Sequence, residues 1–413
     1  MTDQSPPAHI LVLNAGSSSL KSALFALEAG EGANRGIGEC VWKAQIDWPR
    51  SGKKGELRIT VGGAESLREE REISDHRAAF RELFLTLWGG AHPAITSPDQ
   101  IKAVGHRIVH GGTKYRSSVL LTPQIEQELA SYTEYAPLHV PSNIEAIRMA
   151  EEVFGNSLPQ IAVFDTAFHS TLSDAAAAYA LPYEWFQKGV RRYGFHGISH
   201  ASCARRSAEL LRRRQDDFQV VTCHLGSGCS LAAVKDGRSV DTTMGFTPIA
   251  GLMMGTRSGS VDPGALLYMQ KHEGLGAVEL ERILNFESGL LGVSGVSSDM
   301  RDILEARAAG NSRAALAFDM FVHVAAGSIA KMASALDRLD AIAFTGGIGE
   351  HSPDTRQAIV DRLSVFGVRM SSKHMSGASE EALISAPESA FPVLVIPARE
   401  EAEIARECSL LLP

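Results

Sequence analysis

Three glycine-rich loops at the ends of apolar runs are the first candidates for chemistry in this chain. They span residues 14–19 (NAGSSS), 224–230 (HLGSGCS) and 345–349 (TGGIG). Glycine lets the backbone approach a ligand closely, and successive N–H groups in such turns can hold phosphate oxygens. Each of the first two loops, taken alone, fits a tight hairpin turn equally well. The third precedes a predicted helix, whose N-terminal N–H groups favour an anion, so the three together indicate a nucleotide site. Neither of the first two is a P-loop, and in the first, Leu20 precedes Lys21 where that motif requires glycine.

Two arginines stand in unusual surroundings. Arg107 lies inside the apolar strand predicted over 103–109, and Arg257 lies in the glycine- and serine-rich segment 255–260. A guanidinium stays charged at any accessible pH, so a buried one needs an anionic partner. A structural ion pair is the alternative for Arg107. A substrate anion or a phosphoryl group would give both arginines a role.

Histidines and carboxylates gather beside turns and strand ends. We interpret His196 as a donor to a transferring phosphoryl group, with a core histidine as the alternative. The spacing of His106 and His110, and of His196 and His200, could suggest zinc, but neither pair has a cysteine or H-E-x-x-H partner, so we disfavour a histidine metal site.

Asp165 ends the strand predicted over 160–164, where open α/β sheets collect catalytic groups, although a helix N-cap also fits this position. Glu400 and Glu401 follow the strand predicted over 393–396. They could be first-turn acids of the last helix or ligands of a hard cation such as Mg²⁺.

Strands that alternate with helices must position these groups, and they indicate an α/β class. Strands are predicted over 103–109, 160–164, 341–344 and 393–396. Helices are predicted over 76–88, 200–214 and 400–411, and another starts within 137–143 and continues to about 152. Segment 30–73 is predicted to be a peripheral meander. At 413 residues, the chain is long enough for two domains.

Composition excludes several classes of function. The formal net charge of −8, with no long basic run, argues against nucleic-acid or membrane-surface binding, and Arg212 to Arg214 are predicted to be a solvated helix end. Five scattered cysteines without a CxxC pair fit a reducing compartment. No basic leader region is found, and no apolar run is expected to reach the roughly 20 residues of a spanning helix. We therefore expect a cytoplasmic enzyme.

The ordered motifs resemble the acetate kinase family, within the actin-like superfamily that includes sugar kinases and chaperone ATPases. The resemblance runs from Asn14 to Arg406 and is carried by segments 14–21 (NAGSSSLK), 105–112 (GHRIVHGG), 136–139 (APLH), 164–169 (FDTAFH), 192–197 (RYGFHG), 254–259 (MGTRSG) and 346–350 (GGIGE). It implies two actin-like (ribonuclease H-like) domains with a nucleotide cleft, residues 1–167 completed by a C-terminal helix 400–413, and residues 168–399. It also implies Mg²⁺, ATP or ADP as co-substrate, acetate or a similar short carboxylate as acceptor, and a homodimer.

The resemblance also implies roles for single residues. The catalytic group is Arg107, Asp165, His196 and Arg257, and the magnesium ligands are Asn14 and Glu400. Nucleotide contacts are Ser17, Ser19, Lys21, His224, Leu225, Gly226, Ser227, Gly228, Asp299, Met300, Arg301, Gly347, Ile348, Gly349, Glu350 and His351. The substrate pocket is Arg107, Val109, Leu138, His139, Phe195 and Pro248.

The sequence departs from the family pattern mainly in the nucleotide loops. Ser227 and His351 stand where the family has asparagine, and Ala398 and Arg399 stand for Thr-Asn before Glu400. Val140 replaces an asparagine, Ala250 a glutamate and Ser260 an aspartate. These departures bear on nucleotide preference and rate more than on the reaction class.

The implied reaction agrees with the residue types. A carboxylic acid of pKa about 4 to 5 is ionised at pH 7, so it attacks phosphorus without a general base, and two arginines help to bring the anions together. A sugar kinase would need a base and a polar pocket. A non-enzymatic actin-like ATPase that binds a partner or polymerises would leave Arg107 and Arg257 without a role. A propionate kinase stays open, because one methylene changes selectivity by only about 1–3 kcal/mol.

Overall fold

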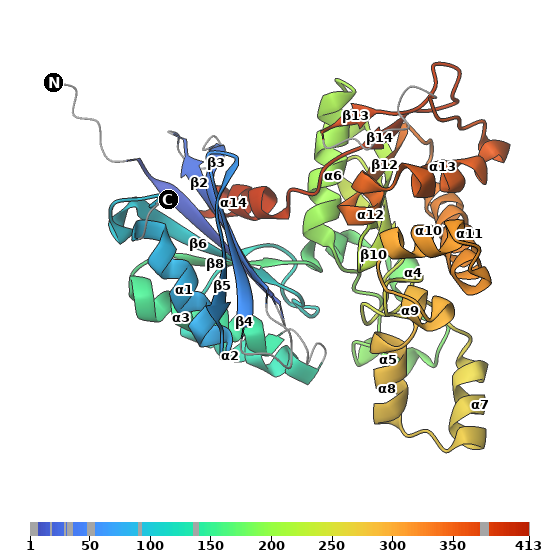
Figure 1. The fold of residues 1–413 in the computed structure, drawn as a ribbon, viewed down its shortest axis with the longest axis horizontal. Helices are drawn as coiled ribbons and strands as arrows, with labels where there is room; N and C mark the ends of the chain where they lie inside the picture. Colours follow the sequence, from blue (N-terminus) through green and yellow to red (C-terminus); the bar gives the residue numbers. More distant parts are fainter. Residues whose placement is uncertain are drawn as a thin grey trace. The chain divides into compact units, whose positions relative to one another are not determined.

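The computed structural model describes residues 7–16, 19–28, 30, 36–47, 54–89, 93–134, 140–371 and 380–412. Its contacts divide the chain into two compact units (Figure 1). Unit 1 comprises Met1–Ala167 together with Arg399–Pro413, and unit 2 comprises Phe168–Ala398. The last helix therefore packs with the first part of the sequence.

Unit 1 is built on an eight-stranded sheet of order β5-β4-β3-β2-β1-β6-β8-β7. The strands are β1 (His9–Ala15), β2 (Ser19–Leu27), β3 (Ile37–Asp47), β4 (Lys54–Val61), β5 (Ala64–Glu72), β6 (Ile101–Ile108), β7 (Val119–Leu120) and β8 (Gln160–Phe164). The helices are α1 (His76–Trp88), α2 (Pro123–Ser131), α3 (Val140–Phe154) and α14 (Glu400–Leu411). Strands β3 to β5 form the edge that was predicted to be a meander.

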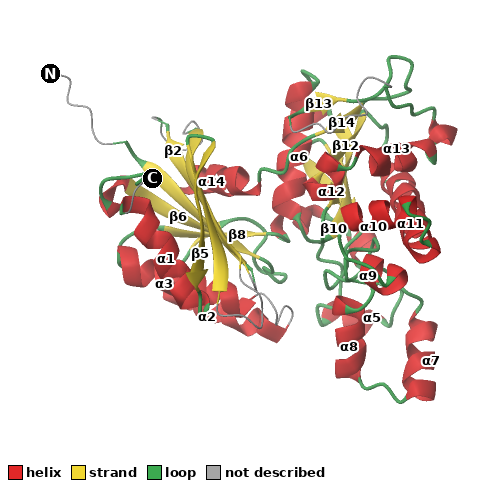
Figure 2. Ribbon diagram, in the orientation of Figure 1, coloured by secondary structure: helices red, strands yellow, loops and turns green. Residues whose placement is uncertain are grey.

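The central strands of unit 1 direct their ends to one edge. Strand β6 pairs in parallel with both β1 and β8, so the loops after Ala15, Ile108 and Phe164 lie at the same edge of the sheet. Helices α1 and α3 cover one face and α14 covers the other (Figure 2). The close approach of α14 requires glycine at position 105, since a Cβ there would lie 2.6 Å from Cys408 Sγ.

Unit 2 is built on a six-stranded sheet of order β11-β10-β9-β12-β14-β13. Its strands are β9 (Gln219–Leu225), β10 (Cys229–Lys235), β11 (Arg238–Thr242), β12 (Ala341–Thr345), β13 (Ala382–Leu383) and β14 (Val393–Val395). Its helices are α4 (Asp174–Ala177), α5 (Tyr183–Gln187), α6 (Gly197–Leu210), α7 (Pro263–Glu273), α8 (Ala277–Phe286), α9 (Gly289–Ser294), α10 (Met300–Ala308), α11 (Ser312–Ala333), α12 (Gly346–His351) and α13 (Pro353–Asp361).

Helix α6 covers one face of the unit 2 sheet and differs in its bounds from the predicted helix 200–214. Cys203 and Ala208 of α6 pack on Val220 and Ala343 of the sheet. The helix ends earlier than predicted because Arg212 adopts φ 53°, a left-handed conformation that stops helix propagation.

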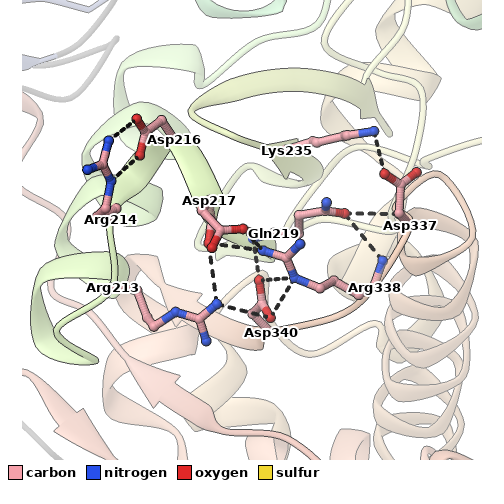
Figure 3. Close-up of polar contacts among 9 residues, drawn as sticks. All are labelled: Arg213, Arg214, Asp216, Asp217, Gln219, Lys235, Asp337, Arg338 and Asp340. Atoms are coloured by element: carbon pink, nitrogen blue, oxygen red, sulfur yellow. Dashed lines mark hydrogen bonds and ion pairs between the residues drawn. The ribbon is translucent and has the colours of Figure 1, made fainter.

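A polar network fixes the register of β9 and β12 where these parallel strands begin (Figure 3). Gln219 N–H donates to Asp340 Oδ2 at 2.8 Å, and Asp340 N–H donates to the Gln219 carbonyl at 2.8 Å. Arg338 donates to Asp340 through Nε at 3.1 Å and also pairs with Asp217. Aligned strand beginnings bring His224 and Thr345 into register at the opposite ends. Arg213 lies 3.9 Å from Asp340, so one arginine of the run from Arg212 to Arg214 belongs to this network.

Helix α11 corrects one expectation. It is 22 residues long and, by length and composition alone, is long and apolar enough to cross a membrane, although no apolar segment of that length was expected. Its buried residues include Phe318, Phe321 and Ile329, and the helix packs on α9, α10 and the sheet. The described contacts are those of a core helix.

Candidate active site

In unit 1, Arg107 and Asp165 form a tight fork at the ends of the parallel strands β6 and β8. Arg107 Nη2 donates to Asp165 Oδ2 at 2.6 Å, and Arg107 Nε lies 3.1 Å from both carboxylate oxygens. Asp165 N–H also donates to the Ile108 carbonyl at 2.9 Å, which fixes the backbone that carries the carboxylate. Asp165 is 2% exposed. It therefore orients Arg107 and is not a helix N-cap.

The other side of the Arg107 guanidinium faces two further oxygen acceptors. Arg107 Nη1 lies 3.4 Å from Asn14 Oδ1 at the end of β1 and 3.4 Å from Glu400 Oε2 at the start of α14. Two carboxylates thus share one guanidinium, which leaves an excess of negative charge in a poorly hydrated place. Such a site favours a further cation.

The protonation equilibria reflect this crowding. Burial lowers the pKa of Arg107, but the charges of Asp165 and Glu400 outweigh burial and hold the pKa above its ordinary value. Burial raises the pKa of Asp165, and the charge of Glu400 adds to this shift, while Arg107 opposes it. A cation beside Glu400 would relieve the repulsion between the two carboxylates.

Asn143 of α3 joins the loops that carry these groups and was not among the predicted site residues. Its Nδ2 donates to the Ala15 carbonyl after β1 at 3.2 Å, and its Oδ1 accepts from Val109 N–H after β6 at 3.2 Å. The side chain is 2% exposed. An asparagine at the start of a helix gives no sequence signal for such a bridge.

The first glycine loop is described in part. Gly16 N–H donates to the Ser19 carbonyl at 2.8 Å, and Lys21 is an exposed residue of β2 opposite Asn14. The predicted contacts Ser17, Leu138 and His139 lie outside the described residues.

In unit 2, His196 and Arg257 converge on Gly228 of the second glycine loop. A Cβ placed on Gly228 would lie 3.2 Å from His196 Cε1, 3.3 Å from His196 Nε2 and 3.6 Å from Arg257 Nη1. The segment of Arg257 is tied to this loop, since Gly255 N–H donates to the Ser227 carbonyl at 3.1 Å. Glycine at position 228 therefore keeps a space between a histidine and an arginine.

Arg257 has no carboxylate partner among the described residues. Arg257 Nη1 lies 4.0 Å from Met254 Sδ, and burial lowers the pKa of the guanidinium. A largely desolvated guanidinium without a counter-ion attracts an anionic ligand strongly. The described part of unit 2 thus contains no anionic side chain paired with Arg257, whereas Arg107 is paired with Asp165.

His196 is held in a strained and specific place. It precedes α6 with φ 56°, a conformation rare for residues other than glycine. Its Nδ1 lies 2.9 Å from Ser230 Oγ, and its ring stacks on His224 with centroids 4.3 Å apart. The spacing of His196 and His200 brings both rings to Ser230, since His200 Nε2 lies 2.8 Å from the same oxygen.

The third glycine loop meets the second. A Cβ placed on Gly226 would lie 3.7 Å from His224 Nε2 and 3.8 Å from Gly347 N. Glu350, predicted to contact nucleotide, accepts from Gly346 N–H at 2.7 Å and from Ala398 N–H at 2.9 Å, so it braces its own loop.

Arg356 holds the end of α12 and was not predicted. It is fully buried, and its Nη1 donates to the carbonyls of Gly349 and Glu350, each at 2.8 Å. Burial lowers its pKa. A charged residue within an ordinary helix gives no sign of this role in the sequence.

The remaining predicted residues of unit 2 lie at several places. Asp299 caps α10 and pairs with the exposed Arg301 at 2.6 Å, while Met300 is buried beneath them. The Phe195 side chain is buried, and its carbonyl lies 3.1 Å from His169 Nε2. The other positions are the buried residues Leu225 and Gly349, the half-buried Pro248 and Ile348, and the exposed Ser227, Gly347 and His351.

No group of three or more histidine, cysteine or acidic side chains that could hold a metal occurs in the described part of the chain. The histidines of the pair His106 and His110 make other contacts: His106 Nε2 lies 2.6 Å from Gln160 Oε1, and His110 Nδ1 accepts from Gly112 N–H at 2.9 Å. All five cysteines are free thiols.

Comparisons with known proteins identify the family. A model of the acetokinase family matches residues 9–406. The chain belongs to this family. An acetate kinase from a Synechococcus species is 47% identical over 407 residues, which cover 98% of this chain and 99% of that protein. An acetate kinase from a Cyanothece species is 43% identical over 403 residues and 98% of both chains.

Solved structures agree with this assignment. Acetate kinase from Porphyromonas gingivalis has a TM-score of 0.87 at 38% identity, covering 98% of this chain and 100% of that one. A propionate kinase from Francisella tularensis has a TM-score of 0.86 at 36% identity, covering 97% and 98%. The chain therefore has the α/β fold of this family, with two sheets, and is an ATP-dependent phosphotransferase that phosphorylates the carboxylate of acetate.

Proposed function

We propose that Arg257 and His196 bind the phosphoryl group that passes from ATP to acetate. The observation that carries this proposal is the guanidinium of Arg257, which lacks a carboxylate partner among the described residues and converges with the His196 ring on Gly228. Phosphoryl transfer is catalysed mainly by positioning the reactants and by stabilising charge on the equatorial oxygens. A cation and a ring N–H donor beside a glycine loop are suited to both tasks.

Arg107 is proposed to bind the carboxylate of the acceptor. Asp165 occupies Nε and one hydrogen of Nη2, which leaves the second Nη2 hydrogen and the Nη1 group, 3.4 Å from Asn14 Oδ1 and Glu400 Oε2, on the outer side of this fork. Acetate is ionised at neutral pH, so the reaction needs no general base. Asp165 can therefore serve as the ion-pair partner that orients Arg107. In this proposal Asp165 fixes the direction of Arg107 and takes no part in proton transfer.

Asn14 and Glu400 are proposed to hold Mg²⁺. Both present oxygen atoms 3.4 Å from Arg107 Nη1, and oxygen ligands with several waters are what this ion prefers. The excess negative charge of Asp165 and Glu400 beside one guanidinium fits a divalent cation. When bound, Mg²⁺ neutralises charge on the nucleotide phosphates.

The nucleotide is proposed to contact the second and third glycine loops. A Cβ on Gly226 would lie within 4 Å of both Gly347 N and His224 Nε2, so the two loops meet at Gly226. Backbone N–H groups of such loops bind phosphates without a large positive charge, which suits a chain of net charge −8.

The acceptor test is a hydroxamate-trap assay with ATP, Mg²⁺ and formate, acetate, propionate or butyrate as separate substrates. We expect the highest kcat/KM with acetate. Val109, Phe195 and Pro248 are the described residues proposed for the apolar pocket of the substrate methyl group. Since the Francisella tularensis relative is a propionate kinase, a higher kcat/KM with propionate would reassign the acceptor.

A cytoplasmic homodimer is the proposed state of the protein. Five free thiols favour a reducing compartment. Helix α7 has no buried residue and exposes Leu267 and Tyr268, by 54% and 61%, so we propose that a second copy covers it. Light scattering of Tyr268→Glu should then show a monomer, and an unchanged dimer would place the interface elsewhere.

A further inference from the structure

A buried chain of hydrogen bonds runs from His196 into the core of unit 2. His196 Nδ1 lies 2.9 Å from Ser230 Oγ, and Ser230 Oγ lies 2.8 Å from His200 Nε2. His200 Nδ1 lies 2.7 Å from Thr222 Oγ1, which lies 3.4 Å from the Ala232 carbonyl oxygen. Ser230, His200 and Thr222 are each 0% exposed, so water does not compete for these contacts.

The strand pairing explains why these residues meet. Thr222 and His224 are two residues apart and lie on the same face of β9, and Ser230 pairs with His224 across the hairpin. Helix α6 lies on this face and brings His200 there, one turn after His196. The i,i+4 histidine pair and the β9–β10 hairpin therefore form one connected polar unit.

The four contacts hold four movable hydrogens when both rings are neutral. Each hydroxyl has one hydrogen, and each neutral imidazole has one N–H. The Ala232 carbonyl can only accept. If Thr222 donates to it, His200 must donate from Nδ1 to Thr222, Ser230 must donate to His200 Nε2, and His196 must donate from Nδ1 to Ser230. This is the one assignment that fills every contact.

We infer that Ser230, His200 and Thr222 are positioning residues that fix the tautomer of His196, with its proton on Nδ1. The inference rests on the role of His196 in the proposed function. It leaves the lone pair of neutral His196 on Nε2, the atom directed to the space beside Gly228.

The assignment has a chemical consequence for the phosphoryl group. A neutral His196 with this tautomer cannot donate from Nε2, so a hydrogen bond to a phosphoryl oxygen requires a second proton on the ring. His196 then acts as an imidazolium cation. In the described part of unit 2, the charged or titratable groups around it include the stacked His224, His200 beyond Ser230 and Arg257 beside Gly228. An anionic nucleotide would offset the charges that this brings together.

Burial keeps His200 itself from taking up the proton. Desolvation holds its pKa well below the ordinary value, and the neighbouring His169 and His224 act in the same direction. His200 therefore stays neutral and transmits the orientation of Thr222 to Ser230.

The test reads the tautomer directly in the full-length protein. Two-bond ¹⁵N–¹H correlation spectra of ¹⁵N-histidine-labelled enzyme, at a pH where His196 is neutral, should show its proton on Nδ1. His196→Gln identifies the signal. A wild-type ring with the proton on Nε2 would overturn the inference.

Two variants at Thr222, which is separated from His196 by Ser230 and His200, sharpen the test. Thr222→Val keeps the shape and removes the hydroxyl, so His200 should donate to Ser230 instead and the proton of His196 should move to Nε2. Thr222→Ser keeps the hydroxyl and should preserve the wild-type tautomer. An unchanged tautomer in a folded Thr222→Val protein would overturn the inference.

Kinetics separate this inference from the proposed function. Ser230→Ala should lower kcat about tenfold, the usual size for a hydrogen bond to a charged group, with little change in the KM for acetate. Ser207→Ala, which removes another buried hydroxyl from α6, should leave both constants unchanged. Wild-type turnover in His196→Ala would withdraw the proposed role of His196. A proton on Nδ1 of the wild-type ring would still support the positioning role of Ser230, His200 and Thr222. Wild-type kcat in Ser230→Ala would show that this chain of hydrogen bonds does not contribute to catalysis.

Discussion

Arg107 and Arg257 are both withdrawn from solvent, yet their surroundings are opposite. Arg107 is surrounded by Asp165, Glu400 and Asn14, and the carboxylates hold its pKa above the ordinary value. Arg257 has no carboxylate partner among the described residues of unit 2, and burial lowers its pKa. The first guanidinium is fixed in direction before any ligand arrives. The second retains most of its capacity to stabilise an anion, so the partners of an arginine distinguish an oriented group from an electrostatic one.

The largest combined effect is expected for Arg107→Ala. Loss of a charged donor at the reacting centre should lower turnover by roughly 10²–10³. The variant should also lose about 3–5 kcal/mol of stability, because Asp165 stays buried without its partner. The hydroxamate assay and thermal unfolding measure the two effects.

A double variant provides the control for Arg107. Arg107→Ala combined with Asp165→Asn should regain much of the lost thermal midpoint but none of the turnover. A single variant as stable as wild type would contradict the importance of the ion pair for unit 1.

Arg257→Ala should lower turnover by roughly 10²–10³ while the thermal midpoint stays the same or rises, since no described ion pair is broken. Arg214→Ala removes an exposed arginine of the same unit and should change neither quantity. If Arg257→Ala destabilised the protein as much as Arg107→Ala, the contrast between the two arginines would be wrong.

Buried histidines predict how stability depends on pH. Burial lowers the pKa of His106 from the ordinary histidine value of about 6.5 to about 4. Between these values the unfolded chain binds a proton that the folded chain does not, so stability is lost as pH falls through this window, by roughly 3 kcal/mol for this residue.

His106→Gln should therefore flatten the loss of stability between neutral and acidic pH, measured by urea denaturation. The exposed His272 is the matched control, and His272→Gln should leave the loss unchanged. An equally steep loss in His106→Gln would show that other groups cause the acid sensitivity.

Gly228→Ala tests the space shared by His196 and Arg257. The new Cβ would lie 3.2 Å from His196 Cε1, closer than most carbon contacts, so the ring must shift. We expect a fall in turnover of about tenfold, from a loss of about 1.4 kcal/mol of transition-state stabilisation. Gly327→Ala places a methyl group in open space on α11 and should leave turnover unchanged.

Ser227→Asn is expected to have the smallest effect. Ser227 is exposed in the second glycine loop, and an asparagine offers an extra donor to the nucleotide. The KM for ATP should fall about threefold, on the scale of one modest hydrogen bond, with that for acetate unchanged. A KM for ATP that stays the same or rises would show that the serine belongs to a repacked nucleotide site.

The sequence predicted the parts of this arrangement that depend on local pattern. Apolar runs ending in glycine located β9 and β12 and the loops after them, and the strand ending at Asp165 was placed correctly. What it could not provide were contacts between distant segments. Nothing near Asn143 indicates that its amide joins β1 to β6, and the spacing of His196 and His200 does not show that both rings meet Ser230, which lies on another element.

Helix α14 has a consequence for how the chain is made. Its buried residues Ile404, Ala405 and Cys408 cover the sheet of unit 1, and Glu400 reaches Arg107, yet residues 168–398 are synthesised in between. At the usual rate of translation, the nascent sheet waits roughly tens of seconds with one apolar face uncovered. During that time β1 and β6 offer a surface to chaperones or to other nascent chains. Unit 1 can therefore complete its folding only after all of unit 2 has been synthesised.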